Sequence, residues 1–396
     1  MRASDFVRKY KPLLIGVTGS TGKTLTKEAI ALALKDDRRV RASHGNYNTP
    51  IGVALSVLGV QAAADRRGWM RLLTGSLLRE IGEKEPDTIV LELGADRPGD
   101  IDALVQKLPF TIGVVTNIGS AHLDYFGSKE MVAHEKMSLL VSLPGNGTAI
   151  MNADEPLVMA MKDHIQAKAI FFGEAGHADV RLGRAQRVGL KGFSGEVQVQ
   201  GTSYEFFLPH ILARHQITSF LAALAVARAL KVDIRQAIGN LRSLTPPPGR
   251  MRIFDGLKGS IIIDDSYNAS PEATLAALKT LAALPGRRKI AILGDMLELG
   301  PKSIYWHNQV GGKVAEVAHV FVAVGEEMRR AQAKALETKG IDTHHFPASR
   351  DVGKWLRDHL KEGDVVLVKG SRAMAMEKVV ERLLANPERD KGNLVP

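Results

Sequence analysis

The chain has 396 residues, which suits two or three domains, and 45% of them are hydrophobic, enough to fill sizeable cores. It contains no cysteine, which excludes disulfide bonds, thiolate metal sites and a cysteine nucleophile. Its formal net charge of +10 favours acidic partners such as nucleotides, but the basic residues are scattered without interleaved aromatics, so we expect no nucleic-acid binding.

The N-terminal residues lead directly into the first predicted strand, residues 13–18. Basic residues precede an apolar run there, 13–17, that is too short for a signal peptide. No run in the chain approaches the roughly 18 apolar residues of a membrane-spanning helix. These features predict a cytoplasmic enzyme that meets ATP.

A phosphate-binding loop follows this strand. The run TGSTGKT, residues 18–24, is followed by a predicted helix over 25–34. In this context backbone N–H groups point at an anion, Lys23 contacts the outer phosphates of a nucleotide, and the Thr24 hydroxyl contacts Mg²⁺. The strict eight-residue pattern needs a glycine at Val17, so this loop is of a shorter kind. Its predicted nucleotide-binding residues are Gly19, Ser20, Thr21, Gly22, Lys23 and Thr24.

The next segment, 60–85, has apolar residues at helical spacing among arginines. Two interpretations remain open. The favoured one is a helix that covers the domain's own apolar surface; the other is a basic amphipathic helix that associates weakly with a membrane surface. We also expect Arg67, Trp69 and Arg71 to contribute to binding of the acceptor substrate.

Strands and helices then alternate, which predicts a doubly wound, mostly parallel α/β sheet. The residues 179–208 instead read as short alternating runs with glycine turns, which predict a small antiparallel patch. The strands expected before that patch cover 88–93, 112–116, 148–151 and 169–172, and the helices expected before and after it cover 129–142, 215–230 and 233–241.

Polar residues cluster where the predicted parallel strands end, which is the edge at which open sheets bind ligands. Glu92 closes an apolar strand, and a carboxylate there is costly unless it is paired or bound to metal. Together with Thr24, Glu92 and His122 could complete a site for a hard cation. Lys136 is either a solvated lysine or a modified lysine that turns toward the phosphate site.

The run Thr245-Pro-Pro-Pro-Gly-Arg250 predicts a stiff linker, because three prolines fit neither a helix nor a central strand. It divides the chain into domains of residues 1–245 and 246–396. The α/β alternation resumes after it, with strands expected over 260–264, 289–293, 320–324 and 364–368.

Two polar turns stand out in the second domain. DDSYNASP, from Asp264, ends a buried strand, and Ser270 with Pro271 suits the start of a helix. That capping role alone does not need the carboxylates, Tyr267 and Asn268 as well. The run from Lys369 to Arg372 likewise follows a strand and opens the last helix, which is an arrangement suited to a carboxylate or a phosphate.

In this order, these segments resemble the Mur ligase family, ATP-dependent amide-forming ligases of cell-wall peptide synthesis, and within it the D-alanyl-D-alanine-adding branch. The resemblance implies a central ATPase domain and a Rossmann-like C-terminal domain. It also implies addition of D-alanyl-D-alanine or a similar amine to a cell-wall peptide precursor, with ATP and Mg²⁺. The stretches that carry it are TGSTGKTLTKE, HGNYNTPIGVAL, VLELGADRPGDI, VVTNIGSAHLDYFGS, DDSYNASPEATLAAL, ILGDMLELG and VKGSRAMAMEKVV.

The resemblance also implies residue roles in the first domain. Lys23 contacts the ATP phosphates, while Thr24, Glu92 and His122 hold magnesium. Lys136 matches a lysine that is carbamylated in several members, where the carbamate binds a second Mg²⁺. The residues placed near the acyl phosphate are Asn46 and Asn48.

In the linker and beyond, Arg250 matches an arginine that reaches the γ-phosphate when the domains close, and Asp265 matches the ribose-binding aspartate. His215 and Asn268 join the expected ATP-binding set. The residues that resemble the stretch receiving the incoming amine are Lys369, Ser371 and Arg372.

Two departures keep other functions open. The family's N-terminal UDP-sugar-binding domain is absent from the sequence, so the ligase could use another carboxylate and amine, or a partner could supply that domain. Gln216 and Ser219 replace two asparagines that lie near the adenine. A folate-type polyglutamate ligase fits the C-terminal motifs poorly. A non-catalytic nucleotide-binding protein is disfavoured by the intact Lys23, Glu92, His122 and Lys136.

Overall fold

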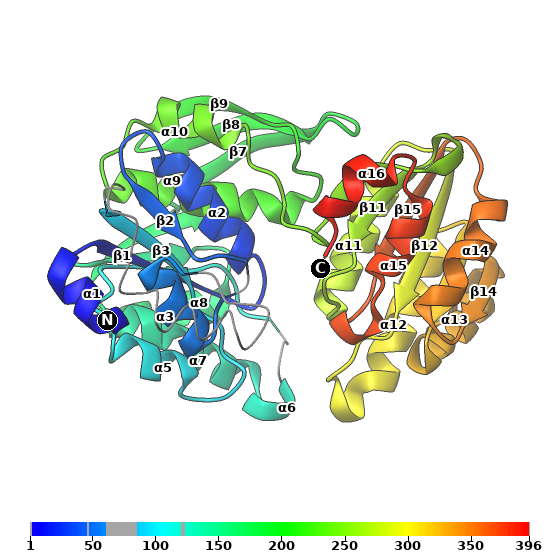
Figure 1. Ribbon diagram of the computed structural model, residues 1–396, viewed down its shortest axis with the longest axis horizontal. Coiled ribbons are helices and arrows are strands. Elements are labelled where there is room, and N and C mark those ends of the chain that lie inside the picture. Colours follow the sequence, from blue (N-terminus) through cyan, green and yellow to red (C-terminus); the bar gives the residue numbers. More distant parts are fainter. Residues whose placement is uncertain (1, 46, 61–84, 120–122, 396) are drawn as a thin grey trace.

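A computed structural model describes residues 2–45, 47–60, 85–119 and 123–395. The predictions for Asn46, for His122 and for the interior of segment 60–85, with Arg67, Trp69 and Arg71, therefore lie outside the described residues. Within them the chain forms two separate sheets, each covered by helices on both faces (Figure 1).

The first sheet has nine strands in the order β2-β3-β1-β4-β5-β6-β7-β8-β9. Its strands pair in parallel as far as β7, whereas β7, β8 and β9 pair antiparallel. This confirms the predicted parallel sheet and its antiparallel patch. The bounds are β1 (Leu13–Thr18), β2 (Val40–Ala42), β3 (Thr88–Glu92), β4 (Ile112–Val115), β5 (Thr148–Asn152), β6 (Lys168–Gly173), β7 (Val180–Arg187), β8 (Phe193–Val199) and β9 (Thr202–Leu208).

Helices cover both faces of this sheet because successive residues of each central strand point to opposite sides. In β1, Ile15 and Val17 pack into a core with α2, α9 and α10, whereas Leu14 packs into a second core with α1, α3, α5 and α7. The helices are α1 (Ala3–Tyr10), α2 (Lys23–Leu34), α3 (Pro50–Leu58), α5 (Asp100–Val105), α6 (Leu123–Phe126), α7 (Lys129–Val141), α8 (Pro156–Ala160), α9 (Ile217–Ala229) and α10 (Ile234–Leu241).

The helix predicted from residue 215 begins two residues later. Residues Arg214–Gln216 form a 3₁₀ turn, and α9 starts at Ile217. The side-chain oxygen of Gln216 accepts hydrogen bonds from the backbone N–H groups of Leu212 and Ala213, at 3.3 and 3.1 Å. This side chain satisfies donors that precede the helix, which explains the tighter first turn.

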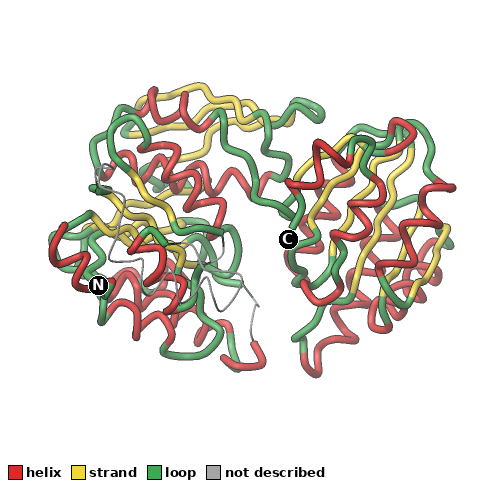
Figure 2. Tube along the Cα trace, in the orientation of Figure 1, coloured by secondary structure: helices red, strands yellow, loops and turns green. Residues whose placement is uncertain are grey.

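The second sheet has six strands in the order β10-β11-β15-β12-β13-β14, all parallel except β10. Figure 2 shows the yellow strands of this half beside red helices. Helices α11, α12 and α13 contribute to one core and α14 and α15 to the other. The bounds are β10 (Arg252–Asp255), β11 (Ile261–Asp265), β12 (Arg288–Gly294), β13 (Val320–Val324), β14 (Asp342–Phe346), β15 (Asp364–Lys369), α11 (Pro271–Ala283), α12 (Ser303–Val317), α13 (Glu326–Lys339), α14 (Ser349–His359), α15 (Glu377–Leu383) and α16 (Pro387–Asp390).

The proline-rich segment joins the two sheets, and the C-terminal end of the chain lies against it (Figure 1). Gly249 has φ +68°, and a Cβ there would lie 2.4 Å from a methyl carbon of Val395, so only glycine fits. Arg252 donates to the carbonyl oxygens of Pro246 and Asn393, at 2.7 and 3.2 Å. The linker is thus held on both sides. The domain boundary at 245/246 stays a prediction.

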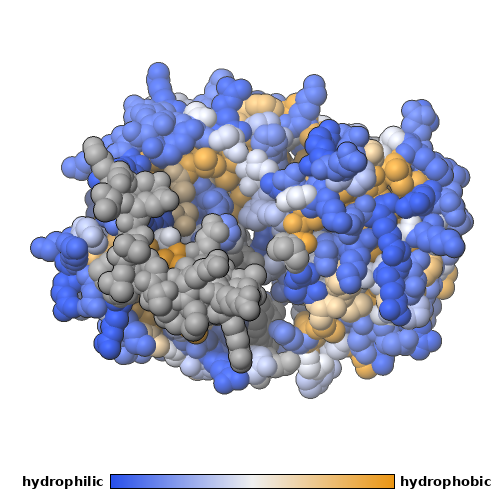
Figure 3. Space-filling model, in the orientation of Figure 1, coloured by the Kyte–Doolittle hydropathy of each residue, from blue (hydrophilic) through white to orange (hydrophobic). Residues whose placement is uncertain are grey.

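The surface is mostly polar on the face shown in Figure 3, where apolar residues form scattered patches on both halves. Among the helices that the structure describes, none combines the length and apolarity that crossing a bilayer requires.

Candidate active site

The predicted phosphate loop is braced by the segment that follows β4. The backbone N–H of Ser20 donates to the Asn117 carbonyl oxygen at 3.0 Å, and that of Thr21 donates to Asn117 Oδ1 at 2.8 Å. Asn117 Nδ2 donates in turn to the Thr21 hydroxyl at 2.6 Å. A Cβ at Gly19 would lie 1.9 Å from the Thr116 hydroxyl, so this approach requires glycine. The loop is therefore shaped by the protein itself.

The sequence alone assigns Asn117 no role. Its signal was its place in the turn after a predicted strand, where loop-bracing side chains are common. Only the strand order, which sets β4 beside β1, makes its contact with Ser20 and Thr21 visible.

Lys23 opens α2, is half-buried, and donates from Nζ to the Gly19 carbonyl oxygen at 2.8 Å. Burial lowers its pKa; the charge of Glu92 opposes that shift, and the charge of Arg250 adds to it. Glu92 and Arg250 therefore both lie within electrostatic range of Lys23. Lys23 opens α2, Glu92 ends β3 and Arg250 lies in the linker, so predicted site residues from the first half and from the linker lie near one another around Lys23.

Glu92, at the end of β3, is 1% exposed, and its Oε2 has no hydrogen-bond partner among the residues that the structure describes. An unpartnered buried carboxylate oxygen is costly unless a cation binds it. Thr24, which is also buried, offers a hydroxyl oxygen from the phosphate loop. Carboxylate and hydroxyl oxygens are ligands that Mg²⁺ prefers, so these residues fit that ion. Within the described ranges no three acidic or histidine side chains gather as a metal cluster.

Lys136, on α7, is 4% exposed, so the interpretation as a solvated lysine is wrong. Its pKa is lowered from 10.5 to about 7, first by burial and then by the charge of Lys23, while the charges of Glu135 and Asp96 oppose the shift. The neighbouring Glu135 carboxylate is bound by two backbone N–H groups, those of Gly99 and Ile101, each at 2.7 Å. Near neutral pH much of Lys136 is an uncharged amine, which is the form that reacts with CO₂.

A second group of predicted residues gathers where β11 and β15 end. Lys369 Nζ donates to Asp265 Oδ2 at 2.6 Å and to the Asn268 carbonyl oxygen at 2.8 Å. Desolvation lowers the pKa of His215; Asp265 opposes that shift and Lys369 adds to it. Lys369, expected beside the amine, is thus paired with the carboxylate expected to bind ribose.

The linker arginine is held in place by its neighbours. The Arg250 guanidinium lies over the Tyr267 ring, 4.3 Å from its centroid, and Gln216 Nε2 donates to the Arg250 carbonyl oxygen at 3.2 Å. Gln216, which the sequence showed as a departure near the adenine, therefore anchors the linker. Tyr267 had been singled out only as part of a polar turn.

The remaining predicted residues have other contacts. The Asn48 carbonyl oxygen accepts from the Gly94 N–H at 3.1 Å, just beyond the end of β3. The Ser371 hydroxyl accepts from the Leu297 N–H at 2.9 Å, and Arg372 pairs with Glu377 at 3.0 Å. Asn48 lies near the Glu92 strand end. Ser371 and Arg372 belong to the second sheet's edge, so their role toward an amine stays a prediction.

Asp264 is a buried carboxylate that binds a backbone N–H of the linker. It accepts hydrogen bonds from the Ser266 N–H at 3.1 Å, the Ser266 hydroxyl at 2.5 Å and the Gly249 N–H at 3.2 Å. Burial raises its pKa to about 6, although the Ser266 hydrogen bonds oppose the shift. Its protonation therefore bears on the stability of the linker region.

We expect Asp264 to make folding stability depend on pH. Because its pKa rises from 3.8 to about 6, the folded state binds the proton more tightly than the unfolded state does. This contribution to the free energy of unfolding is full below pH 3.8 and is lost as the pH rises through about 6. Urea unfolding should show the wild type losing stability relative to Asp264→Asn across that window. A difference that stays constant with pH would contradict this assignment.

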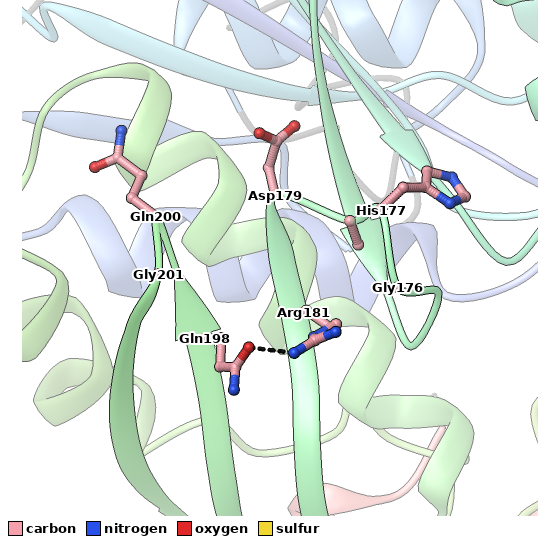
Figure 4. A pocket seen from close by; sticks show the side chains of 8 residues that line it. Gly176, His177, Asp179, Arg181, Gln198, Gln200 and Gly201 are labelled. Atoms are coloured by element: carbon pink, nitrogen blue, oxygen red, sulfur yellow. Dashed lines mark hydrogen bonds between the residues drawn. The ribbon is translucent and has the colours of Figure 1, made fainter.

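A polar cavity of about 340 Å³ lies elsewhere, between the loop before β7 and the β8–β9 turn (Figure 4). Strands β4, β5 and β6 separate β7 from β1, so the cavity does not adjoin the phosphate loop. Its polar groups pair with protein groups: Arg181 donates to Gln198 at 2.5 Å, and Asp179 pairs with Arg228 at 3.0 Å. We assign it no role in the site.

Comparison with known proteins identifies the family that the chain matches. Residues 17–227 match the model described as Mur ligase middle domain, and residues 249–372 match the one described as Mur ligase, glutamate ligase domain. The UDP-N-acetylmuramoyl-tripeptide–D-alanyl-D-alanine ligase of Bacillus subtilis (strain 168) is 29% identical over 390 residues, which cover 97% of this chain and 79% of that protein. The ligase of the same name from Escherichia coli (strain K12) is 32% identical over 388 residues, covering 96% and 79%.

Among solved structures, the MurF ligase from Thermotoga maritima in complex with ADP superposes with a TM-score of 0.79 at 29% identity. The match covers 98% of this chain and 83% of that one. The fold predicted from the sequence, a phosphate-loop domain followed by a Rossmann-like domain, is confirmed by this likeness.

Proposed function

The chain belongs to the Mur ligase family, and from this premise we propose that it is an ATP-dependent ligase that joins a carboxylate to an amine as an amide. The amine is D-alanyl-D-alanine or a similar one, the carboxylate belongs to a cell-wall peptide precursor, and the reaction takes place in the cytoplasm. The observation that carries the proposal is the unpartnered, buried carboxylate oxygen of Glu92 in the electrostatic reach of Lys23. That arrangement suits a metal-bound triphosphate beside the loop.

The chemistry follows from where the side chains lie. The loop N–H groups and Lys23 bind the phosphates of ATP. The substrate carboxylate oxygen attacks the γ-phosphorus, the bond to the ADP oxygen breaks, and an acyl phosphate forms. The amine nitrogen then attacks the acyl carbon, inorganic phosphate leaves, and the nitrogen loses a proton. Lys23 and Arg250 stabilise the charge that develops on the transferred phosphoryl group.

Magnesium would neutralise phosphate charge in this site. Thr24 and Glu92 would hold it, joined by a carbamate on Lys136 and by His122, which lies outside the described residues. The carbamate forms when the neutral Lys136 nitrogen bonds to the carbon of CO₂ and one proton leaves. The low pKa of Lys136 supports this reaction, because the ammonium form cannot make that bond.

The test is a matrix of carboxylates and amines, including UDP-linked and free muramyl peptides, with ATP and Mg²⁺. We expect phosphate release only when a carboxylate and an amine are both present, with one amide formed per phosphate by mass spectrometry. Acceptance of peptides without the nucleotide sugar would point to another substrate pair. Nucleotide binding with no amide from any pair would indicate a non-catalytic binding protein. If a partner protein supplies the UDP-sugar site, amide formation should be seen only when that partner is added.

We also expect the two halves to close on ATP. Lys23 and Thr24 lie on the first half, whereas Asp265 lies on the second and Arg250 in the linker between them, so one nucleotide would bridge them. Solution scattering with Mg²⁺ and a non-hydrolysable ATP analogue should give a smaller radius of gyration than the free protein. The same radius at saturating analogue would count against closure.

A further inference from the structure

Lys27 is a fully buried lysine one helical turn after Lys23 on α2. Its side chain is 0% exposed, and lysine is almost never buried unless its charge is paired. Its Nζ donates to the carbonyl oxygen of Ser43, donates to that of Gly45 at 2.9 Å, and lies 3.1 Å from the Glu28 carboxylate. Two hydrogen bonds to the chain that follows β2 and one ion pair with Glu28 thus hold this ammonium.

Ser43 links this lysine to the metal-site strand. Its carbonyl oxygen accepts from Lys27, its N–H donates to the Val90 carbonyl oxygen at 2.9 Å, and its hydroxyl accepts from the Glu92 N–H at 3.2 Å. One residue therefore joins the helix that begins in the phosphate loop to the strand end that presents the Glu92 carboxylate.

The chain after Gly45 is tied to the same strand. The Asn48 carbonyl oxygen accepts from the Gly94 N–H at 3.1 Å, and a Cβ at Gly94 would lie 2.8 Å from Asn48 Cγ, so the two are closely packed. The segment 43–45 is thus held by Lys27, and Asn48 by the residues after β3. Together residues 43–45 and Asn48 form a wall at the ends of β2 and β3, linked through Lys27 to the helix that begins in the phosphate loop.

We propose that Lys27 is a positioning residue for the carboxylate substrate, an inference that rests on the proposed function. Its buried ammonium fixes the distance between the phosphate-loop helix and the wall formed by residues 43–45 and Asn48. That distance decides how close the attacking carboxylate oxygen comes to the γ-phosphorus. Reacting atoms must be about 3–3.5 Å apart, and a displacement of about 1 Å can cost about 100-fold in rate.

The kinetic test compares three variants. Lys27→Met keeps an unbranched apolar stem but loses every donor, Lys27→Arg keeps a charge and donors, and Lys35→Met removes an exposed lysine at the end of the same helix. We expect Lys27→Met to lower kcat/KM for the carboxylate about 100-fold while KM for ATP stays within about twofold. Lys27→Arg should recover part of the loss, and Lys35→Met should match the wild type. Equal changes in kcat/KM for the carboxylate and in KM for ATP, or no change in either, would overturn the proposal.

A second measurement does not need catalysis. Hydrogen–deuterium exchange of the free protein should show the amides of residues 43–48 exchanging at least about tenfold faster in Lys27→Met, with those of 25–34 unchanged. Lys27→Gln takes its place if the methionine variant does not fold. Unchanged exchange in 43–48 overturns the proposal whatever the activity. A wild type that makes no amide overturns the proposed function instead and leaves the exchange result to decide whether Lys27 holds this wall.

Discussion

Lys23→Ala is expected to lower ATP-dependent amide formation by about 10³-fold while leaving the fold intact. The ammonium is placed to contact the outer phosphates, and removing one such group from a developing charge typically costs about 10²–10³-fold. Among the residues that the structure describes, Lys23 Nζ donates one hydrogen bond, to the Gly19 carbonyl oxygen. Its loss should therefore change the melting temperature little.

The measurement is phosphate release together with product mass, on Lys23→Ala and on Lys35→Ala as the matched control. Lys35 is exposed at the end of the same helix and should show wild-type rates. Near-normal turnover in Lys23→Ala would contradict the assignment of the phosphate loop and the proposed position of ATP.

Lys136→Ala is expected to lose about 10²–10³-fold in activity, part of which short carboxylates such as acetate should restore. The truncated side chain leaves room near Lys23, where an added carboxylate can stand in for a carbamate. The wild type should need dissolved CO₂. Because the pKa of Lys136 is about 7, its ammonium form dominates below that pH, so the carbamate and the activity should both fall as pH drops through about 7.

Carbon-13 NMR of protein equilibrated with labelled CO₂ tests this assignment. A carbamate signal should appear in the wild type and be missing from Lys136→Ala and Lys136→Arg, neither of which presents the neutral amine. Full activity in Lys136→Ala, or wild-type activity that is insensitive to CO₂ removal and without a carbamate signal, would contradict the role.

The sequence predicted the strand and helix that carry the phosphate loop because the signals there are local. The strand at Leu13–Thr18 has the predicted bounds, and α2 begins at Lys23 within the predicted phosphate loop. Glu92 could be placed because the ends of parallel strands share one edge of the sheet, whereas the role expected of Lys136, which lies on α7, came from the resemblance. The chain gave no local sign of Lys27, whose partners lie on the segment after β2 and become neighbours only when the sheet forms.

The strands that the sequence missed are at or near sheet edges. β2 has three residues, β10 is a short antiparallel edge strand, and β14, Asp342–Phe346, is polar at most positions. Such strands lack the continuous apolar run of a buried parallel strand, so periodicity does not reveal them.

The pairing of Lys369 with Asp265 shows a second kind of limit. The two residues are opposite each other in register because β15 lies between β11 and β12. Sequence order places β15 last among the strands, and only the strand order brings its end to β11. The resemblance assigned the two residues to different ligands, whereas the fold makes them one charged pair.

The central claim is that the chain activates a carboxylate as an acyl phosphate, and oxygen-18 transfer tests it most directly. An accepted carboxylate substrate labelled in both carboxyl oxygens is turned over with ATP and the amine, and the released phosphate is analysed by mass spectrometry. The mechanism predicts one labelled oxygen in each inorganic phosphate and one in each amide, because the attacking oxygen leaves with phosphorus. Unlabelled phosphate accompanying amide formation, or phosphate released without any amide, would contradict it.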